Sequence, residues 1–127
     1  MELTENSLKD SKSADLKLFF HCIYEYKKGV RHLLLITEKA YFASYIIRRL
    51  EEENIDFLIQ EASKDTINVF FGAKECIDVV KTFLDKKLNS LTPEQDFMLG
   101  IMLGYDSLAQ CSRYLGNIVS GGNIKAS

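Results

Sequence analysis

The stretch that most constrains the fold is residues 32–37, with the sequence His-Leu-Leu-Leu-Ile-Thr. Its four consecutive aliphatic residues do not alternate with polar ones, which is the pattern of a strand buried on both faces. The end of a buried helix would give the same pattern, but Gly29 just upstream is a typical helix stop and favours a strand. Such a strand needs cover on both sides, from helices or from a partner chain.

The rest of the chain supplies further elements, each predicted from its hydrophobic spacing and its capping residues. The predicted order is α-β-α-β-β-α-α-α, an α/β (α+β) domain with about five helices and a three-stranded mixed sheet. A right-handed parallel crossover is expected between the first two strands, and the third strand is expected to form an antiparallel hairpin with the second. The strand order stays open. The helices are expected at about 13–28, 38–53, 73–85, 93–103 and 107–116, and the other strands at 55–62 and 67–71.

Local signals mark where these elements begin and end. Ser13 and Thr37 are expected to cap the first two helices, and Asn54 is expected to end the second. The clearest signal is Thr92-Pro93-Glu94-Gln95, a capping box with proline in the first helical position. The helix after Gly72 is expected to turn one face inward, made of Cys76, Val79, Val80, Phe83 and Leu84.

Length and charge exclude several classes of protein. A chain of 127 residues suits one domain, expected over 13–116, with a flexible arm at 1–12 and a flexible tail at 117–127. Sixteen basic against eighteen acidic residues, with no basic block, argue against a nucleic-acid binder. The apolar runs are far shorter than the roughly 20 residues that span a bilayer.

The cellular location expected from the sequence is the cytoplasm. The first residues lack the basic start and apolar centre of a signal peptide. The three cysteines, Cys22, Cys76 and Cys111, are widely spaced and odd in number, which suits reduced thiols in a reducing compartment.

Four blocks of the sequence together resemble a small bacterial family known as DUF2023, a domain of unknown function. The likeness spans about residues 18–115. It implies a compact domain of three strands and five helices that forms a homodimer, with members sometimes encoded beside or fused to flavodoxins. It implies no catalytic residues. The four blocks are 24–33, 67–72, 99–106 and 111–115, with the last two the most specific.

No catalytic, cofactor or metal site is expected. The chain contains no phosphate-binding glycine motif of the usual kinds. His21 and Cys22 are neighbours on one helix, about 100° apart, and cannot easily share an ion, and His32 stands apart from them. Cys76 is expected to be a buried small hydrophobe, and Cys111 has no histidine near it in sequence.

A candidate interface lies in the helix over 97–105, which is apolar almost all round. Gly100 and Gly104 stand four residues apart, a spacing that lets another backbone come close. A helix apolar on every side must be buried on every side, either inside the monomer or against a second subunit, and the sequence does not choose between these. The candidate interface residues are Phe97, Gly100, Ile101 and Gly104.

A candidate functional surface is made of Gly72, Tyr105, Asp106 and Arg113. Gly72, between a strand and a helix, either presents backbone N–H groups to an anion or simply allows a tight turn, and the turn is favoured. Asp106 either caps the next helix or holds Arg113 by its charge. Because seven positions separate these two residues, the cap is favoured.

Two functions from different classes remain open. The first is a homodimeric, non-catalytic interaction protein, accessory to a flavodoxin-like electron carrier. The second is a small-molecule-binding or enzymatic domain that uses the Gly72 turn and the surface of Tyr105, Asp106 and Arg113.

Overall fold

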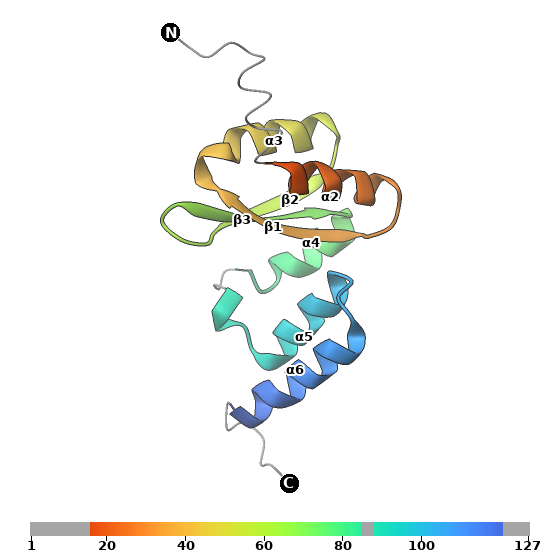
Figure 1. Cartoon of the computed structure of the whole chain (residues 1–127), viewed down its shortest axis with the longest axis vertical. Coiled ribbons are helices and arrows are strands. Elements are labelled where there is room, and N and C mark those ends of the chain that lie inside the picture. The colour runs from red at the N-terminus through yellow and green to blue at the C-terminus, as the bar shows by residue number, and fades with distance from the viewer. Residues whose placement is uncertain (1–15, 85–87, 121–127) are drawn as a thin grey trace.

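A computed structural model of the chain describes residues 16–84 and 88–120 and confirms the α+β class and the predicted order of elements. The molecule is elongated, with the first two helices and the sheet at one end and a hairpin of two helices at the other (Figure 1). The elements are α2 (Lys17–Lys27), β1 (Leu33–Lys39), η1 (Ala40–Phe42), α3 (Ala43–Glu52), β2 (Asp56–Glu61), β3 (Thr66–Gly72), α4 (Lys74–Lys81), η2 (Leu88–Ser90), α5 (Pro93–Met102) and α6 (Ser107–Ser120).

The sheet differs from the prediction in how its strands pair. Its order is β1-β3-β2, and β3 is antiparallel to both neighbours. Since β1 and β2 both run against β3, they point the same way, as a crossover through α3 requires, but they are not adjacent. The expected mixed sheet with a parallel pair is therefore wrong. β3 is buried along almost its whole length and occupies the centre, whereas β2, with Asp56 and Glu61 exposed, suits an edge.

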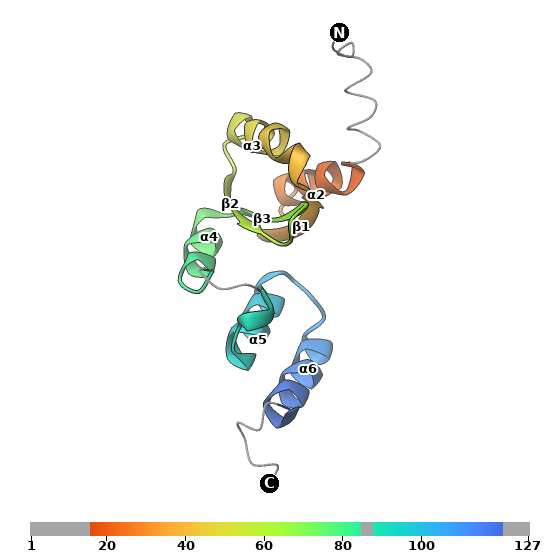
Figure 2. The ribbon, with the colours of Figure 1, turned by 90° about the vertical axis from the view of Figure 1, so that its left-hand side faces the viewer.

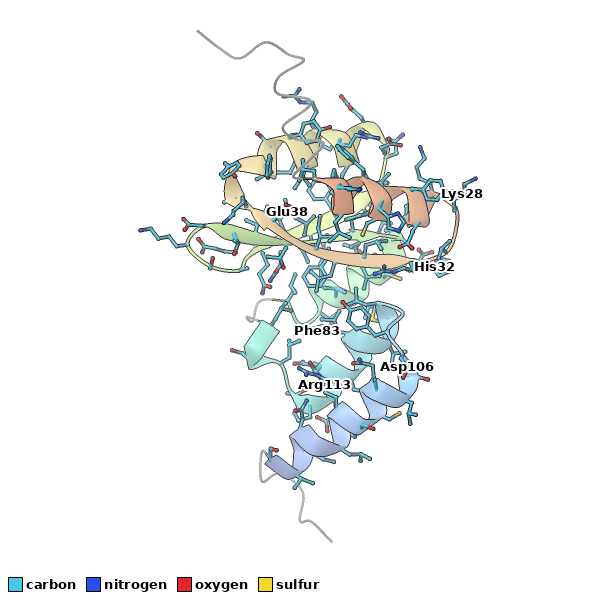
Figure 3. The ribbon with its side chains drawn as sticks, viewed as in Figure 1. Lys28, His32, Glu38, Phe83, Asp106 and Arg113 are labelled. Carbon is cyan, nitrogen blue, oxygen red and sulfur yellow. The ribbon has the colours of Figure 1, made fainter. Side chains whose placement is uncertain are left out.

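Both faces of the sheet are covered, as the sequence of β1 predicts. Leu34 and Ile36 join a core with α2 and α3 on one face. Leu33 joins a second core on the other face with Phe70, α4 and α5. Figure 2 shows α2 and α3 on one side of the strands and α4, α5 and α6 on the other. Phe83 belongs to the second core, between the sheet and the helical hairpin (Figure 3).

The prediction that Thr37 caps a helix is wrong. β1 continues to Lys39, and α3 starts only at Ala43, after the short turn η1. Thr37 lies opposite Asn68 in the sheet, and its Oγ1 donates a hydrogen bond to Asn68 Oδ1 at 2.7 Å. The buried amide of Asn68 thus has a partner, which a cap at Thr37 would remove.

Other boundaries follow the prediction with two differences. Asn54 has a positive φ of 58° after α3, and the capping box of α5 is complete. In α4, Ile77 and Val80 are buried whereas Val79 is 39% exposed, so the inward face is rotated from the expected one. α6 continues to Ser120, so the tail expected from residue 117 begins inside a helix. The arm at 1–12 and the cap at Ser13 lie outside the described residues.

We predict that Gly72→Ala destabilises the fold by more than about 1 kcal/mol. Gly72 has a φ of 148°, and a Cβ there would meet the backbone of His32, the residue just before β1. Gly116→Ala is the matched control, because a Cβ there has no neighbour within 4 Å and helical alanine is favoured over glycine by roughly 0.5–1 kcal/mol. Urea unfolding measures both, and equal stability of the two variants would contradict the prediction.

Candidate functional site

The α5–α6 hairpin is set by three local features of the sequence. Thr92 Oγ1 accepts a hydrogen bond from the backbone of Gln95 at 3.1 Å and starts α5. Gly104, with a φ of 80°, turns the chain after α5. Asp106 Oδ2 then accepts from the backbone N–H of Ala109 at 2.9 Å and caps α6. Capping was the favoured role of Asp106 in the sequence, and the structure places the side chain in it.

The face of α6 that meets α5 carries polar side chains together with the buried Ile118. Arg113 donates from Nε and Nη2 to the two carboxylate oxygens of Asp96, at 2.7 and 3.2 Å. Asn117 donates to the same carboxylate at 3.4 Å, and Tyr114 donates to Glu94 at 3.1 Å. The carboxylate of Asp96 raises the pKa of Arg113 above its usual value by hydrogen bonding and by charge. Hydrogen bonds and an ion pair thus join the two helices, together with the ring contact of Phe97 and Tyr114.

The opposite face of α6 is apolar and exposed. Leu108, Leu115 and Val119 are 74%, 58% and 53% exposed. At about 100° per residue these three side chains fall within roughly 40° of one another, with exposed Cys111 beside them. We call Leu108, Cys111, Leu115 and Val119 the apolar stripe of α6. A groove of about 390 Å³ runs beside the stripe, lined by Glu94, Phe97, Cys111, Tyr114 and Leu115.

The four candidate interface residues take different roles in the structure. Phe97 packs on Tyr114, with ring centroids 5.4 Å apart. Gly100 is buried, and a Cβ there would meet the end of the Gln110 side chain, so the glycine leaves room for this side chain of α6. Gly104 forms the turn, and Ile101 is 40% exposed. The space at Gly100 is therefore filled by a side chain of the same chain, while Ile101 stays available to a second subunit.

The candidate functional surface is brought together only in part. Tyr105 and Arg113 line one cavity of about 430 Å³ between β1, η2 and the hairpin. Asp106 does not line it and faces the start of α6, as Figure 3 shows, with Arg113 farther along the same helix. The partner of Arg113 is Asp96, 17 residues before it, instead of Asp106. Sequence reasoning missed Asp96, although a hairpin that turns at Gly104 would bring these two positions side by side.

Gly72 lies apart from the other candidates, at the end of β3. The N–H of the next residue, Ala73, donates to the carbonyl oxygen of His32 at 2.9 Å. The backbone at this turn is therefore engaged with β1, and the close approach of His32 accounts for the glycine. Of the two interpretations of Gly72, the tight turn fits the structure.

With this geometry in place, the chain can be compared with known families. A family model described as a protein of unknown function, DUF2023, matches residues 17–117. The chain belongs to the DUF2023 family. No curated protein matches it. The match covers every element from α2 to most of α6, including both helices of the hairpin.

The thiols of this DUF2023 protein differ in exposure. Cys22 is buried, Cys76 is half-buried and Cys111 is exposed, and all three are free. Burial raises the pKa of Cys22 and of Cys76, and the charge of Glu75 raises that of Cys76 further. Within residues 16–84 and 88–120, no group of three or more His, Cys, Asp or Glu side chains is arranged to hold a metal ion. No helix in the same ranges is long and apolar enough to cross a membrane.

We predict that Asp106→Asn leaves stability nearly unchanged, whereas Asp106→Ala lowers it by about 1 kcal/mol. The reason is that Asn accepts the Ala109 N–H about as well as Asp, and the charge of Arg113 is met by Asp96. Urea unfolding of both variants measures the difference. A loss with Asn as large as with Ala would show that the charge of Asp106, and not its capping bond, is what stabilises the protein.

Proposed function

We propose that this DUF2023 protein is a non-catalytic interaction module that self-associates through the outer face of the α5–α6 hairpin. One observation carries the proposal: α6 turns Arg113 and Tyr114 toward polar partners on α5 and its apolar stripe away from the molecule. The non-catalytic part rests on the sequence, in which no nucleotide-binding or catalytic motif is present.

The placement of the arginine and of the exposed apolar residues on α6 is the reverse of what a helix at the edge of a monomer usually shows. An amphipathic surface helix places its apolar face toward the core and its charged face toward water. In α6 the charged Arg113 faces Asp96 of α5, and Leu108, Leu115 and Val119 face outward. Burying one such leucine fully is favourable by roughly 1.5–3 kcal/mol, so covering the stripe gives a substantial gain.

A second copy of this chain is the occupant that best fits the stripe. Arg113 is the only charged side chain in α6, and Asp96 pairs with it, so two stripes can meet without bringing like charges together. Cys111 and Leu115 of the stripe also line the groove of about 390 Å³, whose one charged residue, Glu94, accepts a hydrogen bond from Tyr114. In a two-fold symmetric contact the stripe of each copy can pack against the groove of the other copy, so that both apolar surfaces are buried.

The interface extends beyond α6 onto α5. A stable dimer typically buries about 800 Å² on each partner, and a single helix of 14 residues, about 21 Å long, offers little more than a stripe. Ile101 and Met98 of α5 are 40% and 37% exposed. Phe97 lines the groove, and Ile101 follows it by one helical turn on α5. We therefore include Phe97 and Ile101, two of the four candidate interface residues, in the proposed contact.

We predict that Leu115→Gln weakens the dimer about a hundredfold or more, because a two-fold contact loses the leucine twice, roughly 3 kcal/mol in all. Leu18→Gln is the matched control, since Leu18 is 56% exposed against 58% for Leu115 but lies on α2, at the other end of the molecule. Sedimentation velocity across a range of concentrations measures the mass. A wild type that is monomeric throughout, or a Leu115 variant that keeps the dimer mass, would contradict the proposal.

A flavodoxin-like partner and a cytoplasmic location remain predictions from the sequence and the resemblance. An accessory role would require the dimer to leave some surface free for that partner. Adding an FMN-loaded flavodoxin to the same sedimentation experiment tests the partner, and the absence of any heavier complex would remove that part of the proposal.

A further inference from the structure

A cavity of about 430 Å³ lies between the sheet and the inner side of the hairpin. Its hydrocarbon lining comes from three separate parts of the chain: Leu35 of β1, Leu88 and Leu91 around η2, and Leu99 of α5 with Leu103 just after it. Its polar lining is made of Asp96, Tyr105, Gln110 and Arg113. A pocket of this size, lined by apolar side chains with a few polar groups, is typical of a small-ligand site.

The guanidinium of Arg113 determines which polar group fits. Asp96 occupies the edge formed by Nε and Nη2, at 2.7 and 3.2 Å. Nη1 makes no hydrogen bond to the described residues, and the side chain is 60% exposed. The edge formed by Nη1 and Nη2 is therefore open to a second planar anion, since a guanidinium has five N–H donors in a fixed fork.

The charge of Asp96 limits the anion that can bind there. Asp96 and Arg113 together are neutral, so their net attraction for an anion is weak and grows only in proportion to its charge. The cost of removing the anion from water grows with the square of its charge, which disfavours a doubly charged phosphate monoester. A carboxylate has one charge and the flat geometry that pairs with the open edge. Gln110 and Tyr105, which also line the cavity, supply further hydrogen-bonding groups.

We infer that this cavity binds a small amphipathic monocarboxylate, with its carboxylate on the open edge of Arg113 and its hydrocarbon body against the five leucines. This activity goes beyond self-association. Arg113 and Gln110 lie on the face of α6 toward α5, whereas the apolar stripe lies on the opposite face. Either proposal can therefore fail while the other stands.

The probe for this site is sodium octanoate, which joins a single carboxylate to an aliphatic chain. Titration followed by amide chemical shifts in NMR is expected to show saturable shifts at residues that line the cavity. 1-Octanol, which lacks the charge, and hexyl phosphate, which carries a second charge, are each expected to bind at least about tenfold more weakly.

Arg113→Gln is expected to weaken octanoate binding at least about tenfold. Arg48→Gln, which removes an exposed arginine of α3 on the other side of the sheet, is expected to bind like the wild type. Arg113→Gln also breaks the ion pair with Asp96, so a second variant is needed that leaves this pair intact. Leu91→Gln places a polar side chain in the hydrocarbon lining of the cavity. It too is expected to weaken octanoate binding about tenfold.

The inference is overturned if octanoate gives no saturable shifts. It is also overturned if Leu91→Gln and Arg113→Gln both bind as the wild type does. Hexyl phosphate binding as tightly as octanoate would overturn the monocarboxylate assignment.

Discussion

The fold follows from one constraint: both faces of a small sheet are apolar and must be covered by helices. Leu34 and Ile36 of β1 point into one core, Leu33 points into the other, and β3 does the same with Phe71 and Phe70. Because no face of these strands suits water, helices must lie on both sides. α2 and α3 cover the first face. The second face has only α4, with eight residues, and so it also requires α5.

The position of α6 follows from that arrangement. Leu99 of α5, and Leu103 just after the end of α5, complete the second core. The other sides of α5 contact α6 or face solvent. α6 then packs on α5 through Asp96 and Arg113, at a distance from the sheet (Figure 1). A helix held by polar contacts outside the core has no apolar partner within the described chain for its outer face. The stripe and the cavity both arise from the same hairpin, one on each side of it.

The sequence was most informative where structure is decided locally. The buried strand, the capping box at Thr92 and the cap at Asp106 each depend on neighbouring residues, and each is present in the structure. The order β1-β3-β2 could not be predicted, because pairing between strands is a tertiary choice. The prediction for Thr37 was wrong because a threonine hydroxyl can either cap a helix or form a hydrogen bond to the neighbouring strand, and here it donates to Asn68. Asp96 was missed because its contact with Arg113 exists only once the hairpin has formed.

A second copy that covers the outer face of α6 would slow hydrogen exchange there, because helix amides exchange through local opening that an interface suppresses. Hydrogen exchange of the wild-type chain should therefore be compared at low and high protein concentration. The amides of α6 around Leu108, Leu115 and Val119 are expected to become more protected as concentration rises, and those of β1 and β3 to stay unchanged. Protection of α6 that does not depend on concentration, or new protection on α2 instead, would show that α6 does not form the dimer contact.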